Sequence, residues 1–271
     1  MTPDASLKGR VVLITGGARG LGREMALALA EADARLCITG SKETPELSMT
    51  AGDLADMVGA SNVLSLAADV TDQAAADMTV RNCIETFGRV DVLVNNAGRG
   101  MRLISETFNT APTRFWEADA DAWRRIVDVN VNGPFLMARA TIPWMLRQKF
   151  GKIVNISTSD QTMVRRGYAP YGPSKAFLEA ASRVWVEDLA GTGIDVNVLL
   201  PGGATDTDLL PPSPAKKGAD GHLLSPDVMR DAILWLVSDA SNGQTGGRYI
   251  GRLWDGPEAA RDPSAAKPKI M

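Results

Sequence analysis

The sequence has few of the residues that build metal centres, disulfides and histidine-dependent hydrolytic sites. It contains two cysteines, Cys37 and Cys83, and a single histidine, His222. Neither cysteine has the neighbours of a zinc or redox motif, so we expect two buried, reduced thiols. One histidine in a loop rich in Gly and Asp does not support a multi-histidine metal site or a serine–histidine nucleophile. The sequence therefore predicts no metal site.

An excess of basic charge and a long apolar run are also missing. The 29 Lys and Arg residues and 32 Asp and Glu residues give a net charge of −3, so no overall basic field favours nucleic acid or an anionic membrane. No apolar run approaches the roughly 20 residues of a membrane span, and the first residues lack an apolar signal core. We expect a small-molecule substrate as partner, no nucleic acid, no membrane and a cytoplasmic location.

Short β-branched runs alternate with longer helical patterns along the whole chain. Strands are predicted at Val11–Thr15, Arg35–Thr39, Val63–Ala67, Val92–Asn95, Lys152–Ser157, Asp195–Leu200 and Gly247–Gly251. Helices are predicted at Leu21–Glu31, Asp72–Phe87, Asp119–Lys149, Pro170–Ala190 and Pro226–Ser238, with Asp72, Asp119 and Ser225 or its neighbours as N-terminal caps. Such alternation is typical of a parallel sheet with helices on both faces. We predict one α/β domain, doubly wound, with a seven-stranded parallel sheet.

The 271 residues, 45% of them hydrophobic, suffice for one such domain with a large core. We assign residues 1–256 to it and expect residues 257–271, rich in Pro, Ala and charge, to form a flexible tail. Three stretches are predicted as long loops: Ser41–Asn62, Arg99–Ala118 and Thr205–Ser225. Long loops in compact α/β domains are usually functional or disordered.

A glycine-rich turn follows the first predicted strand directly. It runs Thr15-Gly16-Gly17-Ala18-Arg19-Gly20-Leu21-Gly22 and opens the first predicted helix. Glycines at such spacing let the backbone approach a phosphate, which backbone amides and the helix dipole then hold. Taken alone, the turn is equally compatible with close structural packing.

With this turn, the chain resembles the short-chain dehydrogenase/reductase family, whose first motif is Thr-Gly-x-x-x-Gly-x-Gly. The resemblance covers about Lys8 to Asp255. Three further motifs are similar to those of the family and occur in the same order. They are Asp69-Val70 after the third strand, Asn95-Asn96-Ala97-Gly98 after the fourth and Pro201-Gly202 after the sixth. The resemblance implies a Rossmann-like fold and a nicotinamide cofactor. It further implies that the cofactor contacts Thr15, Gly16, Arg19, Gly20, Leu21, Gly22, Gly40, Ser41, Asp69, Val70, Asn96, Ala97, Gly98, Tyr171, Lys175, Pro201 and Gly202.

The end of the second strand bears on the choice between NAD(H) and NADP(H). An acidic residue there accepts hydrogen bonds from the ribose 2′-hydroxyl of NAD and repels the 2′-phosphate of NADP. This chain has Gly40 at that position, followed by Ser41 and Lys42, with Arg19 in the turn. Positive charge without an acid favours a phosphate, so we predict NADP(H) as the preferred cofactor, with NAD(H) possible. The alternative is that Arg19 and Lys42 are solvated surface charges.

Tyr171 and Lys175 are the predicted proton-transfer pair. Residues at positions i and i+4 share a helix face, so a lysine ammonium can stabilise the phenolate and lower the tyrosine pKa from its usual value of about 10. By resemblance, Tyr171 is the proton donor, Lys175 also contacts the nicotinamide ribose, and Asn130 belongs to the proton path. Asn132 is the nearby competitor for the role of Asn130.

The residue that polarises the carbonyl comes from the run Ser157-Thr158-Ser159 at the end of the fifth strand. The family's spacing from the tyrosine selects Thr158, whose hydroxyl can donate the hydrogen bond that a serine would. Ser159 is the second choice if the chain turns there. Arg165 and Arg166, between Thr158 and Tyr171, either recognise an anionic group or are solvated.

The predicted function is therefore an NADP-dependent oxidoreductase that interconverts a carbonyl and a secondary alcohol by hydride transfer, with proton transfer assisted by Tyr171 and Lys175. The alternatives are an NAD-preferring alcohol dehydrogenase of the same family, and a catalytically silent nucleotide-binding redox sensor. The resemblance implies that the helices Asp119–Lys149 and Pro170–Ala190 pack against symmetry mates, and here Pro170–Ala190 carries more apolar surface than one sheet-facing stripe requires. We expect them to form the interface of a homotetramer or homodimer.

Overall fold

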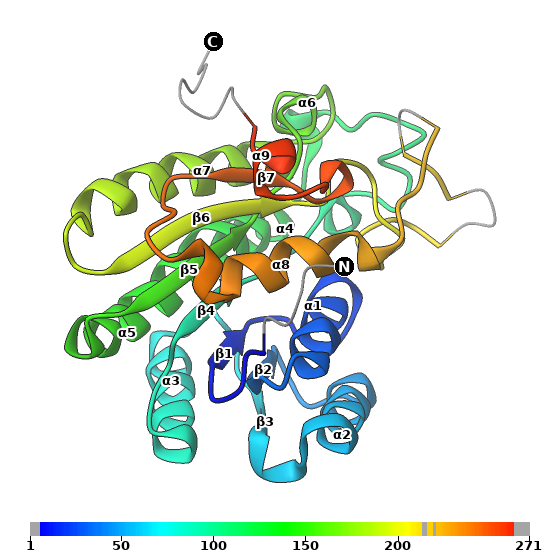
Figure 1. The fold of residues 1–271 in the computed structure, drawn as a ribbon. Coiled ribbons are helices and arrows are strands. Elements are labelled where there is room, and N and C mark those ends of the chain that lie inside the picture. Colours follow the sequence, from blue (N-terminus) through cyan, green and yellow to red (C-terminus); the bar gives the residue numbers. More distant parts are fainter. Residues whose placement is uncertain (1–5, 213–215, 219–220, 263–271) are drawn as a thin grey trace.

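The computed structural model describes residues 6–212, 216–218 and 221–262 (Figure 1). Within these residues, seven parallel strands form one sheet in the order β3-β2-β1-β4-β5-β6-β7. The strands are β1 (Val11–Ile14), β2 (Arg35–Gly40), β3 (Val63–Ala67), β4 (Val92–Asn95), β5 (Gly151–Ile156), β6 (Ile194–Leu200) and β7 (Arg248–Ile250). The predicted fold class is confirmed. The strand order reverses between β1 and β4, and such a switch point opens a crevice at the carboxyl ends of the strands.

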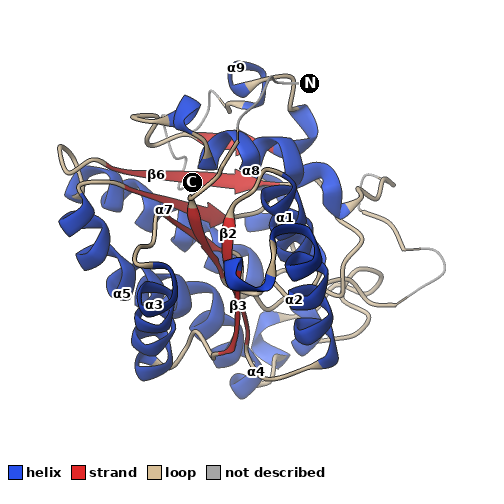
Figure 2. Cartoon of the chain, turned by 60° about the horizontal axis from the view of Figure 1, so that its bottom comes forward, coloured by secondary structure: helices blue, strands red, loops and turns tan. Residues whose placement is uncertain are grey.

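Helices cover both faces of the sheet (Figure 2). On one face lie α1 (Gly20–Glu31), α2 (Pro45–Val58) and α8 (Arg230–Val237), and on the other α3 (Gln73–Phe87), α5 (Gly133–Gln148) and α7 (Tyr171–Asp188). The shorter helices are α4 (Ala120–Val127), α6 (Asp160–Met163) and α9 (Pro257–Ala260). A π-helical turn spans Asp128–Asn132, and 3₁₀ turns span Ala60–Asn62, Met101–Leu103, Phe115–Glu117, Pro226–Met229, Asp239–Ser241 and Gly251–Leu253.

The core has two apolar layers because successive side chains of a strand point to opposite faces. Along β1, Val12 and Ile14 belong to the layer under α1 and α8, whereas Val11 and Leu13 belong to the layer under α3 and α5. All four side chains are completely buried. Because both faces are filled with apolar side chains, polar chemistry is left to the carboxyl edge of the sheet.

Two predicted elements differ from the structure. The stretch Ser41–Asn62, predicted as a loop, contains α2, which Thr44 caps by accepting a bond from the backbone N–H of Leu47 at 3.3 Å. Only three of its residues are buried, so its apolar periodicity is weak. The helix predicted over Asp119–Lys149 is interrupted by the π-helical turn between α4 and α5. The predicted caps Asp72 and Asp119 do accept backbone bonds, whereas the side chain of Ser225 makes no capping bond.

The C-terminal boundary expected at Pro257 falls within a packed segment. Residues 257–260 form α9, Ala260 is buried, and Arg261 bridges to Tyr249 of β7. The carboxylate of Asp262 accepts a bond from Arg248 at 2.5 Å. The rest of the expected tail, residues 263–271, lies outside the described residues.

Candidate active site

The glycine turn is tied to the end of β4 by Thr15 and Asn96. The side-chain amide of Asn96 donates to the carbonyls of Thr15 and Gly16 at 3.0 and 2.9 Å. The hydroxyl of Thr15 accepts bonds from the backbone N–H groups of Asn96 and Ala97 at 3.1 and 3.0 Å. These bonds connect the glycine turn and the Asn95–Gly98 motif, which are far apart in sequence, into one corner at the carboxyl edge of the sheet.

The N-terminus of α1 has the features of an anion cradle. Its N-cap residue, Arg19, makes no capping bond with its side chain, and the first turn has no acidic residue. Gly16 and Gly20 have φ of +66° and +56°, which disfavour side chains with a Cβ. A Cβ on Gly22 would stand 2.2 Å from the carbonyl oxygen of Gly16. The bare turn and the uncapped amides fit a pyrophosphate, and Leu21 anchors the helix against the core beneath them.

At the end of β2, the structure explains why glycine occupies position 40. A Cβ on Gly40 would meet the carbonyl oxygen of Lys42 at 3.2 Å and a methyl group of Leu47 at 3.3 Å. An acidic side chain therefore cannot enter without displacing these neighbours. Ser41 and Lys42 are exposed. Arg19 pairs with Asp208 at 2.6 Å, from the loop after β6, and both side chains are more than half exposed.

Arg99 is a residue of this crevice that the sequence analysis missed. It directly follows the Asn95–Gly98 motif, and its guanidinium donates to the hydroxyl of Ser41 at 3.4 Å, from the end of β4 to the end of β2. Burial, and then the nearby charges of Arg125 and Arg19, lower the pKa of Arg99. A cation placed immediately after the Asn-Asn-Ala-Gly motif was the signal available in the sequence.

The other predicted cofactor residues border the same edge. Asp69 is exposed, and its carboxylate accepts bonds from the backbone N–H and the hydroxyl of Thr71 at 3.0 and 2.8 Å. Val70 is buried against Gly133, where a Cβ would stand 2.7 Å from a Val70 methyl group. The carbonyl of Pro201 accepts a bond from the Arg252 N–H at 3.0 Å, and Gly202 has φ of +91°.

The side chains of Thr158 and Tyr171 lie within reach of a hydrogen bond, which acts to lower the pKa of Tyr171. Tyr171 begins α7 and is partly buried. Burial raises the pKa of Tyr171 above its usual value, and the Thr158 bond only partly offsets this. The expectation that Lys175 lowers this pKa is therefore not met in the structure, because desolvation of the phenolate is the dominant effect.

Lys175 lies one helical turn after Tyr171 and is 5% exposed. Its ammonium donates to the carbonyl of Ile156 at 2.8 Å. Burial lowers its pKa to about 8, while the charge of Glu179 acts in the opposite direction. A Cβ on Gly98 would lie 3.9 Å from this ammonium, so the Asn95–Gly98 motif and the lysine are neighbours.

Asn130 occupies the π-helical turn and is completely buried. Its side-chain oxygen accepts the N–H of Arg99 at 2.8 Å, and its amide donates to the carbonyl of Arg99 at 2.9 Å and to the hydroxyl of Ser174 at 3.0 Å. Its competitor, Asn132, is exposed and donates to Asp128 at 2.8 Å. Local π-helical turns are frequent at functional sites, and this one directs the Asn130 side chain toward the backbone of Arg99 and the hydroxyl of Ser174.

Both serines that flank Thr158 are committed elsewhere. Ser157 donates to Glu179 at 2.5 Å. Ser159 caps α6, accepting the N–H of Thr162 at 3.3 Å. Of the three hydroxyls, that of Thr158 is the one that meets Tyr171.

A buried arginine on β7 holds the strand end that carries Thr158. Arg248 donates to the carbonyl of Thr158 at 3.0 Å and to the carboxylates of Asp160, Glu179 and Asp262 at 2.5, 2.9 and 2.5 Å. Its side chain is 7% exposed. Burial raises the pKa of Glu179, while Arg248 and Ser157 act to lower it. The arginine thus ties β5, α6, α7 and the C-terminal segment together.

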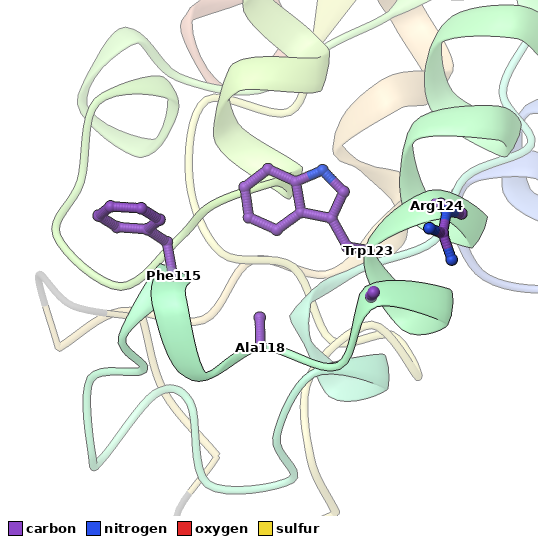
Figure 3. A pocket seen from close by; sticks show the side chains of 5 residues that line it. Phe115, Ala118, Trp123 and Arg124 are labelled. Carbon is purple, nitrogen blue, oxygen red and sulfur yellow. The ribbon is translucent and has the colours of Figure 1, made fainter.

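Two hollows share Phe115, and the second also borders the segment that leads to Tyr171. The first, of about 310 Å³, is lined by Phe115, Ala118, Ala120, Trp123 and Arg124. In Figure 3, Phe115, Ala118 and Trp123 surround this space and give it an apolar wall. The second hollow, of about 230 Å³, shares Phe115 and lies between residues 113–116 and 165–169.

Neither a membrane-spanning helix nor a metal cluster occurs in the part of the chain that the structure describes. No described helix is long and apolar enough to cross a bilayer. Within the same residues, no group of three or more His, Cys, Asp or Glu side chains is placed to hold a metal ion. Cys37 and Cys83 are both buried and free, as predicted.

Comparisons with known proteins agree with the motifs. The family model described as short chain dehydrogenase matches residues 10–218. The chain is 32% identical over 254 residues to a short chain dehydrogenase, mpl6, of Monascus purpureus, covering 91% of this chain and 82% of the relative. It is 31% identical to a 3-oxoacyl-[acyl-carrier-protein] reductase of Thermotoga maritima, covering 89% and 95%.

Among solved structures, this one is similar to that of a 3-ketoacyl-(acyl-carrier-protein) reductase from Brucella melitensis complexed with NADH. The TM-score is 0.77 at 30% sequence identity, and the match covers 90% of this chain and 96% of the other.

Proposed function

Because the chain belongs to the short-chain dehydrogenase family and is an NAD(P)-dependent oxidoreductase, we propose that it interconverts a carbonyl and a secondary alcohol with NADP(H) as its preferred cofactor. The observation that carries this proposal is the cluster of Thr158, Tyr171, Lys175 and Asn130 at the carboxyl edge of β4 and β5. The side chains of Thr158 and Tyr171 lie within reach of a hydrogen bond there, and the ammonium of Lys175 lies beside Gly98.

When bound, the nicotinamide supplies or accepts the hydride. The phenol of Tyr171 gives its proton to the carbonyl oxygen of the substrate in the reductive direction. The hydroxyl of Thr158 donates a hydrogen bond to the same oxygen and stabilises its developing negative charge. Burial raises the pKa of Tyr171, so at neutral pH the phenol is in the protonated form that carbonyl reduction requires.

Lys175 and Asn130 position the groups that carry out this chemistry. The ammonium of Lys175 is held by the Ile156 carbonyl, one helical turn from Tyr171, where it faces the region assigned to the nicotinamide ribose. Asn130 holds the backbone of Arg99 and the hydroxyl of Ser174 together. It thereby keeps the β4 loop and the start of α7 in register, which is the alignment that proton transfer needs.

Positive charge at the end of β2 supports the preference for NADP(H). Arg99 reaches Ser41, the residue directly after Gly40, and Arg19 and Arg125 are close enough to lower its pKa. An anion between these guanidinium groups would relieve their repulsion. An acidic side chain of the kind that favours NAD is absent at Gly40, where a Cβ would press on Lys42 and Leu47. We assign to Arg99, rather than to the Asp208-paired Arg19, the main contact with a ribose 2′-phosphate.

The NAD-preferring alternative is favoured by one observation, since the similar Brucella reductase is described in complex with NADH. Fluorescence titration of NADPH and NADH decides between the two cofactors. We expect wild type to bind NADPH at least about tenfold more tightly, and Arg99→Gln to lose about tenfold for NADPH alone, the value of one hydrogen bond to a charged group. Arg125→Gln controls for the loss of charge without loss of the Ser41 contact. Equal binding of both cofactors by wild type would refute the NADP preference.

The catalytic assignment is tested with Tyr171→Phe, which removes one hydroxyl and keeps the ring. A panel of ketones and secondary alcohols is screened by the absorbance of the reduced nicotinamide. With an active substrate, turnover should fall by about 10²–10⁴-fold, while the dissociation constant of the cofactor changes less than threefold. Turnover of Tyr171→Phe close to that of wild type would contradict the mechanism.

A homo-oligomeric state is supported by apolar side chains that the single chain leaves exposed. Phe135 and Leu146 of α5 and Phe177 and Val184 of α7 are 50%, 44%, 53% and 57% exposed. We propose that α4–α5 and α7 form the interfaces of a homotetramer, with a homodimer as the smaller alternative. Light scattering should give a multiple of the 28.8 kDa chain mass. Phe177→Lys should reduce the measured mass, and a monomeric wild type at micromolar concentration would refute the proposal.

We also propose that the enzyme works in the cytoplasm. The support is chemical, since Cys37 and Cys83 are both buried and free, as in proteins of reducing compartments.

A further inference from the structure

The second hollow, of about 230 Å³, combines basic and aromatic side chains close to Tyr171. Its lining includes Arg114, Arg165, Arg166, Phe115 and Trp116, and contains no acidic residue. We call it the basic hollow. The backbone of Ala169 also lines it, two residues before the proposed proton donor.

The two walls of the basic hollow are packed against each other. The hydroxyl of Thr113 donates to the carbonyl of Gly167 at 2.9 Å. Gly167 has φ of +79°, and a Cβ on it would stand 3.0 Å from the Thr113 nitrogen and 3.1 Å from Pro112 Cα. The glycine thus allows a close approach of two loops that are distant in sequence, so the hollow has a defined shape.

Two of its three arginines have defined contacts with neighbouring side chains. The guanidinium of Arg165 lies 5.0 Å from the centre of the Tyr168 ring and donates to the Tyr168 hydroxyl at 3.4 Å. Tyr168 in turn packs edge-on against Phe108 with ring centres 5.5 Å apart. Arg114 lies 5.9 Å from the Trp116 ring and pairs with the exposed Glu117 at 3.2 Å.

The aromatic lining is unusually accessible to solvent. Phe115 is 64% and Trp116 is 67% exposed, and their rings pack edge-on with centres 5.1 Å apart. Exposed apolar patches rimmed by polar groups mark binding sites. Because Phe115 also borders the apolar first hollow (Figure 3), apolar surface continues beyond the arginines.

We propose that the basic hollow binds the anionic group of the carbonyl substrate, so that the enzyme prefers apolar or aromatic carbonyl compounds that carry a carboxylate. The inference rests on the proposed carbonyl chemistry at Tyr171. Guanidinium groups bind carboxylates through paired, charge-assisted hydrogen bonds. The aromatic pair contacts the apolar body of the substrate, and a cationic substrate is repelled.

The test compares 3-benzoylpropionate with its methyl ester, which differ by one charge. Wild type should show kcat/KM at least about tenfold higher for the acid, as expected for one or more charge-assisted bonds. In Arg165→Gln/Arg166→Gln this ratio should fall to within about threefold of one, with kcat/KM for the ester nearly unchanged. Arg81→Gln, which removes an exposed arginine of α3 that lines neither hollow, should keep the wild-type ratio.

Isothermal titration of 3-benzoylpropionate into wild type, the double variant and Arg81→Gln separates binding from turnover. If the double variant alone binds 3-benzoylpropionate more weakly, the role of the basic hollow is supported, whether or not any ketone is reduced. Failure of wild type to reduce any ketone would refute the carbonyl chemistry and not the basic hollow. Reduction of acid and ester with equal kcat/KM by wild type overturns the hollow while leaving that chemistry intact. The proposed role of the basic hollow is also overturned if the double variant keeps the wild-type ratio of kcat/KM for acid and ester. The same holds if a change in oligomeric mass is the only effect of the double variant.

Discussion

Arg248→Met removes the cation at the centre of the buried cluster behind Thr158. The arginine is 7% exposed, and its partners Glu179 and Asp262 are 19% and 13% exposed. Asp160, at 66% exposed, is screened by water and contributes little. Methionine therefore removes the cation that pairs with two largely buried carboxylates. Breaking a buried pair in this way costs about 3–5 kcal/mol, and we expect the free energy of unfolding to fall by that amount at neutral pH.

The loss should depend on pH in a defined direction. Burial raises the pKa of Glu179, and Arg248 is the strongest influence that lowers it. Without the arginine, the folded-state pKa rises further above the unfolded value of about 4.3. The folded variant then binds more protons than the unfolded chain, so its stability falls as pH rises through this window and recovers as pH falls. The variant should therefore be closest to wild type near pH 5.

The assay is urea unfolding followed by tryptophan fluorescence at pH 5 and pH 7.5, at one protein concentration because any oligomerisation contributes to stability. Arg230→Met is the matched control, since Arg230 also pairs with two glutamates, Glu24 and Glu31, but is 24% exposed. We expect its cost to be below about 1 kcal/mol. A cost below about 1 kcal/mol for Arg248→Met, equal at both pH values, would refute the reasoning.

Three further changes test single features of the site. Thr158→Val removes the hydroxyl bonded to Tyr171 and should lower kcat by about 10²-fold or more, whereas Ser159→Ala should cost only the α6 cap; the reverse ranking of kcat would reassign the role. Gly22→Ala places a Cβ 2.2 Å from the Gly16 carbonyl oxygen, so cofactor binding measured by calorimetry should weaken at least about tenfold. Gly52→Ala is the control, because a Cβ there meets nothing within 4 Å and cofactor binding should not change. Lys175→Met should abolish turnover yet raise the free energy of unfolding at pH 7, because it removes a buried charge whose pKa is lowered to about 8. This gain in stability should shrink between pH 8 and about 10.4, where the unfolded lysine also loses its proton. A variant less stable than wild type at pH 7 would contradict this prediction.

The sequence by itself determined the layered fold and predicted the residues of the candidate site. Short β-branched runs such as Val11–Ile14 must be buried on both faces, so they predict a parallel sheet with little ambiguity. Glycines that tolerate no Cβ, as at Gly22, and the i,i+4 pair of Tyr171 and Lys175 are local constraints, and local constraints are visible in a linear sequence. The structure places these residues along the same edge of the sheet.

Only the tertiary structure decided which polar groups are neighbours and which effect dominates their chemistry. The pKa of Tyr171 is raised rather than lowered, because burial, which spacing does not reveal, outweighs its hydrogen bond. Arg19 pairs with Asp208, and Arg99 reaches Ser41, since both contacts join loops after different strands. Arg248 and Asp262 meet behind Thr158 for the same reason. Strand order sets these distances, and nothing local in the sequence encodes them.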